Sequence, residues 1–82
     1  MKIIRFYWEP NLQRDVTDLV LTVTRQTKTL LIAVSPRNPT YEWRFRKPAK
    51  IEEGAHIYPT PRTVKSWAFQ YRLLEVENEN SV

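Results

Sequence analysis

Five positively charged side chains lie close together in the middle of this 82-residue chain. They fall within fourteen consecutive residues that contain only one acidic residue. The five are Arg37, Arg44, Arg46, Lys47 and Lys50. Because Arg44 and Arg46 are two residues apart, a β-strand would present both on the same face. A positive stripe of this kind suits the phosphates of a polyanion, and it predicts binding of single-stranded nucleic acid.

Aromatic side chains alternate with these arginines and allow two interpretations. The rings of Tyr41, Trp43 and Phe45 share one strand face, opposite the arginines. Exposed rings would stack on bases, whereas buried rings would supply the core that a small domain needs. The need for core area favours burial, which would leave Arg44 and Arg46 on a solvated face beside Glu42 or Glu53.

A second group of rings suggests a different class of partner. Phe6, Tyr7 and Trp8 are consecutive, so a strand places rings on both of its faces, and a lone small domain covers both faces poorly. The alternative function is therefore a structural or adaptor subunit that binds another protein, or another copy of itself, through this strand. Salt separates the two hypotheses, because nucleic-acid binding weakens as salt rises and an apolar contact does not.

The residues that most enzymes use are scarce. The only histidine, His56, has no serine nearby in the sequence, and there is no cysteine to act as a nucleophile. His56 with Glu52 and Glu53 lacks the regular spacing of a metal site, and one glycine in the chain rules out a glycine-rich phosphate loop. The sequence therefore predicts a non-catalytic protein without a metal or another cofactor.

Composition bears on location as well. The lack of cysteine is typical of a reducing compartment, so we expect a cytoplasmic protein. The first ten residues carry both basic and acidic charges, and the longest uncharged apolar run, residues 30–34, is short. These features predict neither a signal peptide nor a membrane partner.

Alternating apolar residues predict the elements that must position these side chains. Strands are expected over residues 2–8, 17–25, 29–34, 41–46 and 65–73. A hairpin turn at residues 25–28 would pair Leu21 with Ile32 and place Leu30, Ile32 and Val34 in the core. A helix competes with the last strand, because Thr60-Pro61 resembles a helix start and residues 61–76 contain apolar side chains at helical spacing.

These elements fit one small domain. The fold class predicted is all-β, a five-stranded antiparallel barrel or compact sandwich over residues 1–74. The 17-residue connection over residues 47–63 is long, so either Ile51 and Ile57-Tyr58 dock as short edge pieces or the loop is functional. Residues 75–82, with three glutamates, are expected to form an acidic tail opposing a body of net charge +7 (thirteen basic and six acidic residues).

Overall fold

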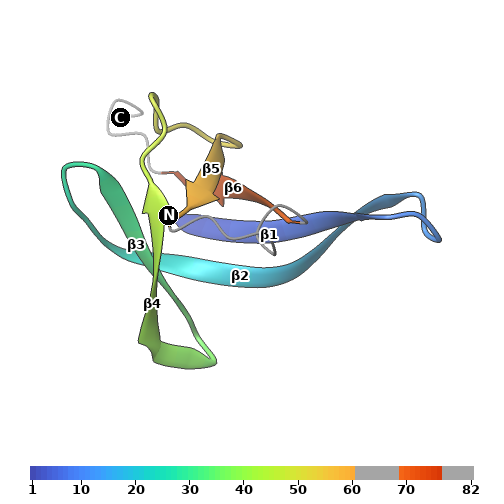
Figure 1. The fold of residues 1–82 in the computed structure, drawn as a ribbon, viewed down its shortest axis with the longest axis horizontal. Coiled ribbons are helices and arrows are strands. Elements are labelled where there is room, and N and C mark those ends of the chain that lie inside the picture. Colours follow the sequence, from blue (N-terminus) through green and yellow to red (C-terminus); the bar gives the residue numbers. More distant parts are fainter. Residues whose placement is uncertain (61–68, 77–82) are drawn as a thin grey trace.

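The computed structural model, which describes residues 1–60 and 69–76, is a closed antiparallel barrel. Its strands are β1 Lys2–Glu9, β2 Arg14–Gln26, β3 Leu30–Ser35, β4 Asn38–Arg46, β5 His56–Pro59 and β6 Gln70–Leu74. Each strand pairs with the next in the chain, and β6 pairs with β1 to close the barrel (Figure 1). The all-β class and the small antiparallel barrel are therefore as predicted, with one strand more than expected.

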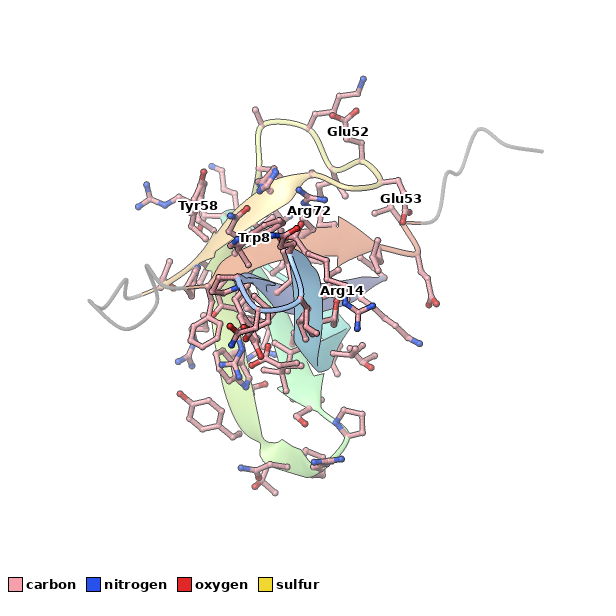
Figure 2. The ribbon with its side chains drawn as sticks, turned by 90° about the vertical axis from the view of Figure 1, so that its right-hand side faces the viewer. Trp8, Arg14, Glu52, Glu53, Tyr58 and Arg72 are labelled. Carbon is pink, nitrogen blue, oxygen red and sulfur yellow. The ribbon has the colours of Figure 1, made fainter. Side chains whose placement is uncertain are left out.

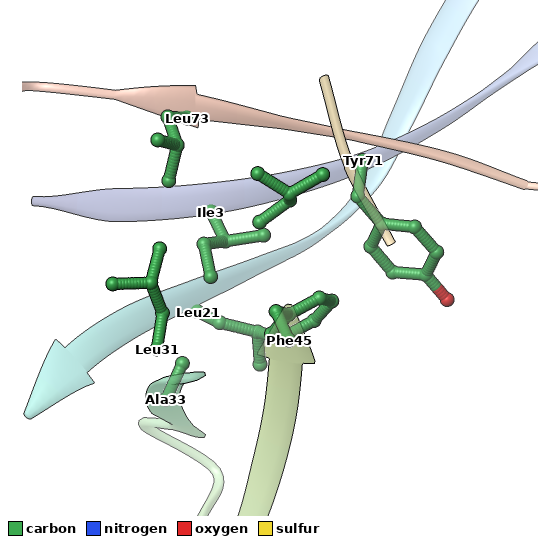
Figure 3. Packing of buried hydrophobic residues seen from close by; sticks show 8 residues of the cluster. Ile3, Leu21, Leu31, Ala33, Phe45, Tyr71 and Leu73 are labelled. Carbon is green, nitrogen blue, oxygen red and sulfur yellow. The ribbon is translucent and has the colours of Figure 1, made fainter. Parts of the chain in front are cut away.

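The barrel interior receives at least one apolar side chain from every strand (Figure 3). The central cluster consists of Ile3, Leu21, Leu31, Ala33, Phe45, Ile57, Tyr71 and Leu73. The Phe45 ring lies in the middle, with its centroid 5.3 Å from that of Tyr71. The two-residue period of each strand explains this arrangement, because every second side chain points inward.

The register of β2 against β3 differs from the predicted one. Val23 pairs with Ala33, and a bulge between Val23 and Arg25 brings Arg25 opposite Ile32. Leu31 and Ala33 therefore point into the central cluster, and the prediction that Leu30 and Val34 do so is wrong. Ile32 is buried as predicted, although it lies outside that cluster.

The β2–β3 turn and the pattern of β3 explain this error. β2 continues to Gln26, and the Thr27 hydroxyl accepts hydrogen bonds from the backbone N–H groups of Leu30 (3.1 Å) and Thr29 (3.4 Å). Residues 30–34 are all apolar, so their pattern alone does not identify the inward face.

Two other connections are tighter or more structured than expected. Ser35 pairs with Asn38 across a two-residue turn, so β4 begins before Pro39 and not after it. In the long connection, Ile57 and Tyr58 do form a short strand, β5, as one of the two alternatives expected, whereas Ile51 lies in no strand and is exposed. The single glycine, Gly54, precedes β5 with a φ of +81°, a conformation that favours glycine.

The barrel bends through irregular pairing, with register shifts in β1–β2, β2–β3 and β3–β4. β1 pairs with β6 over Lys2–Phe6, and its hairpin with β2 continues farther as a projecting two-stranded arm (Figure 1). We call residues 7–16 the arm.

The two residues that follow β6 are docked on the barrel. Backbone N–H groups of Glu75 and Val76 donate to the Glu53 carboxylate at 3.1 and 3.0 Å, and Val76 packs against the core. The competing helix over residues 61–76 is replaced by strand β6 at residues 70–74, while residues 61–68 and the tail residues 77–82 lie outside the described part. Within the described part, no helix is long and apolar enough to cross a membrane.

Candidate nucleic-acid interface

Strand β4 presents Arg44 and Arg46 on the outside of the barrel, as the alternation predicted. Both side chains are exposed, and Phe45 between them is fully buried. Trp43 packs partly against the core, with its ring stacked 6.3 Å from that of Phe45. The expectation that the whole aromatic set is core is wrong for Tyr41, whose side chain is 58% exposed.

A pocket lies at the end of β4, beside the β2–β3 turn. It is lined by Lys28, Thr29, Leu30, Arg46, Lys47 and Thr60. Three of these six side chains are cationic and none is acidic, so we call this the basic pocket. Two backbone hydrogen bonds hold its walls together, from Lys47 N–H to the Thr29 carbonyl (2.9 Å) and from Thr60 N–H to the Arg44 carbonyl (2.8 Å).

Carboxylates do not neutralise the basic pocket in the described part of the chain. Glu42, the acidic residue on β4, is engaged by Arg25, with Nη2 3.1 Å from Oε1 and Nε 3.4 Å from Oε2. Glu53, the other predicted neighbour, accepts the two backbone bonds at the end of β6. Neither Arg44 nor Arg46 forms an ion pair with a described residue. Their charge therefore acts outward, toward a ligand or counterions.

The structure places the five residues of the predicted stripe in three different positions. Arg46 and Lys47 line the basic pocket, and Arg44 lies two residues before Arg46 on the same face of β4. Arg37 occupies the β3–β4 turn at the opposite end of β4, about 30 Å away at roughly 3.3 Å per strand residue. Lys50 lies in the following loop and pairs with Glu52 at 3.5 Å. Three of the five predicted residues are thus brought together.

Two residues at this site were not among the predicted ones. Lys28 comes from the β2–β3 turn, which the altered register places beside the end of β4. Tyr58 lies directly across from Arg46 on β5, and its side chain is 52% exposed. The local sequence gave little signal for either, because β5 is only four residues long and Lys28 has no charged neighbour. Their proximity follows from the strand order.

The predicted protein-interface residues have three different environments. Phe6 is only 4% exposed, and the Arg72 guanidinium lies over its ring at 4.5 Å. The Tyr7 ring packs edge-on against Phe69, with centroids 5.9 Å apart. Trp8, on the arm, is 58% exposed, so it is the member of the set with most of its surface available.

A cation is also held near the point where the arm leaves the barrel. Arg5 makes two hydrogen bonds to Asp18, Nε–Oδ1 at 3.0 Å and Nη2–Oδ2 at 2.8 Å, and lies 4.4 Å from the centre of the Phe69 ring. The hydrogen bond to Asp18 raises the pKa of Arg5, and burial raises the pKa of nearby Tyr71. The charge of Arg5 is thus paired with that of Asp18, and Arg5 does not contribute to the basic pocket.

Other chemistry finds little support in the described residues. Across residues 1–60 and 69–76, no group of three or more His, Asp or Glu side chains could hold a metal ion. The His56 ring lies 6.5 Å from the Phe6 ring, centroid to centroid. Glu53 accepts backbone hydrogen bonds and Glu52 pairs with Lys50, so the acidic pair beside His56 serves contacts within the loop and strand ends.

The site therefore combines a basic pocket with an exposed ring and has no neighbouring carboxylate partner in the described chain. Comparisons of the sequence with protein families and with curated proteins, and of the fold with solved structures, found no match.

Proposed function

We propose that this protein binds single-stranded nucleic acid, with the basic pocket holding the phosphate backbone. The observation that carries the proposal is the composition of the pocket: Lys28, Arg46 and Lys47 converge from two separate segments, and no acidic side chain lines it. Cations that converge without a carboxylate attract a polyanion, because binding releases the counterions that otherwise surround its phosphates.

The ring beside the pocket favours a single strand over a duplex. Tyr58 is cross-strand from Arg46 and more than half exposed. A ring next to a cationic groove allows an unpaired base to stack while its phosphate is held, and every base has a face for such stacking. In a duplex the bases are already stacked and paired, so this ring would add little.

Salt dependence tests the proposal directly. We expect a labelled oligothymidylate to bind more weakly as salt rises, with a log-log slope of about −0.7 for each phosphate neutralised. The double change Lys28→Gln and Arg46→Gln should bring that slope about 1.4 units closer to zero. Stability should change by less than about 0.5 kcal/mol, because both side chains lack ion pairs with described residues.

A matched control removes the same charge elsewhere. Arg37→Gln with Lys50→Gln also lowers the net charge by two, but both residues lie outside the basic pocket. The control should retain most of the wild-type affinity and slope. Equal losses in both double variants would mean that only net charge matters, and no binding by the wild type at about 50 mM salt would refute the proposal.

A second candidate function is protein assembly through the arm. Its specific support is the exposure of Trp8 (58%) and of Leu12 (55%) near the arm's tip. Sedimentation of the purified protein, with and without nuclease treatment, separates the candidates. A nuclease-resistant oligomer that persists at high salt and dissociates on the double change Trp8→Ala and Leu12→Ala would favour assembly.

A further inference from the structure

A second surface of the barrel combines a cation with rings, as the basic pocket does together with the neighbouring Tyr58. It lies on the outside of β5, β6 and β1, where His56 pairs with Arg72 and Arg72 pairs with Ile4. Phe6 and Trp8 continue the outer face of β1 toward the arm. Figure 2 shows Trp8 and Arg72 on the same side of the barrel. We call Phe6, Trp8, His56 and Arg72 the arm-side face.

The charge of Arg72 is uncompensated within the described chain. Its guanidinium carbon lies 4.5 Å from the centre of the Phe6 ring, and its buried Nε has no hydrogen-bond partner there. None of the described side chains pairs with it as an ion, and the outer positions of β5, β6 and β1 carry no acidic residue. Asp15 of β2 lies on the same face but farther along the arm, opposite Trp8. Stacking on an aromatic ring fixes the guanidinium plane while its positive charge stays available to an anion.

The arm-side face and the basic pocket belong to one continuous surface. Arg46 and Tyr58 are neighbours across β4 and β5, and His56 and Arg72 are neighbours across β5 and β6. The path from β4 to β1 crosses three strand spacings, about 14 Å around the barrel. Cations and exposed rings thus follow one another along a track that leads from the pocket to Trp8.

We propose that the arm-side face is a second subsite for the same nucleic-acid strand, in which Arg72 contacts a phosphate and Trp8 stacks on a base. This inference depends on the proposed function and extends it, since it predicts that the nucleic acid runs around the barrel from the basic pocket to Trp8. Charge and rings together favour this ligand, because the uncompensated arginine attracts an anion and the exposed indole offers a flat surface on which a base can stack.

Oligonucleotide length separates the second subsite from the first. Fluorescence anisotropy would measure the affinity of oligothymidylates of four and twelve nucleotides for the full chain. The tetramer can be held by the basic pocket alone, whereas the dodecamer reaches both subsites. We expect Trp8→Ala to weaken dodecamer binding at least 5-fold and to leave tetramer binding unchanged, because stacking of one base contributes that much or more.

Matched variants identify the cause. Trp8→Phe keeps an aromatic ring and should restore most of the dodecamer affinity, and Arg72→Gln should weaken dodecamer binding and reduce its salt slope by about 0.7. Arg14→Gln also removes one charge, but Arg14 pairs with Glu9 on the face of the arm opposite Trp8 and Asp15, and it should have no effect. If Arg72→Gln unfolds the protein by uncovering Phe6, Trp8→Ala still decides the question.

The outcomes separate the two proposals. If the dodecamer binds and Trp8→Ala leaves its affinity unchanged, the second subsite is refuted while the basic pocket stands. If the Lys28→Gln and Arg46→Gln variant binds the dodecamer as well as the wild type does, the basic pocket is refuted. If neither oligonucleotide binds the wild type, both proposals fail.

Discussion

The neighbouring leucines of β3, Leu30 and Leu31, provide a matched test of the barrel register. Leu31 is fully buried in the central cluster, whereas Leu30 is partly exposed on the outside beside the basic pocket. The same substitution to alanine removes the same atoms at both positions, so the difference reports their surroundings. The register predicted from the sequence alone would reverse the two environments.

The expected magnitudes follow from burial. Leu31→Ala removes a side chain with no exposed surface and leaves a cavity, so it should cost about 3 to 5 kcal/mol. Leu30→Ala loses only part of its burial and leaves no enclosed cavity, so it should cost about 1 kcal/mol. A domain of 82 residues has a total stability of roughly 4 to 12 kcal/mol, and the first change should bring it close to unfolding.

Urea denaturation followed by circular dichroism measures both costs, provided that the slope with urea is the same in each variant. If Leu31→Ala lies partly unfolded without denaturant, Leu31→Val still ranks the two positions when it is compared with Leu30→Val. A cost for Leu30 equal to or greater than that for Leu31 would refute the observed register and, with it, the position of Lys28 beside β4.

Three further predictions concern the ends and turns of the barrel. Asp18→Asn should destabilise the fold by about 2 kcal/mol, because it weakens a bidentate contact with the partly buried Arg5. The control Asp15→Asn should cost less than about 0.5 kcal/mol. Thermal denaturation measures both variants, and equal costs would contradict the importance of the contact. Burial raises the pKa of Tyr71, so as pH rises this phenol ionises in the unfolded chain before it does in the folded one. The contribution of Tyr71 to the free energy of unfolding should be full below about pH 10 and fall above it, so stability should decline less steeply in Tyr71→Phe. Identical alkaline profiles of the two proteins in urea denaturation would contradict this. Gln13, at the tip of the arm, has a φ of +53°, so Gln13→Gly should stabilise the protein by up to about 1 kcal/mol, and a loss of stability by the same assay would contradict it.

The sequence predicted the strands better than their pairing. In β2 and β4 the apolar and polar residues alternate, and Leu21 and Phe45 point inward as expected. In β3 five consecutive apolar residues give no such signal, and the turn and the bulge after Val23 decide which face is buried. Ile32 is nearly fully buried although it lies on the outer face, between Arg25 and Arg44 in the register, where long side chains can cover it.

The candidate site was predictable only where its residues are close in sequence. The density of charge indicated Arg44, Arg46 and Lys47, which lie together. It also included Arg37, which a hairpin turn carries to the other end of β4, and Lys50, which an acidic neighbour occupies. Contributions from other strands require knowledge of which strands are neighbours, and a single sequence does not provide it.

Mapping of backbone amide shifts by NMR during titration with oligothymidylate tests the central claim most directly, because it locates the ligand without any substitution. The account predicts saturable shifts that are largest at residues 28–30, 46, 47 and 58, that extend to residues 8 and 72 with the longer oligonucleotide, and that diminish with added salt. Shifts absent from residues 28–30 and 46–47, or confined to the tip of the arm, would contradict it.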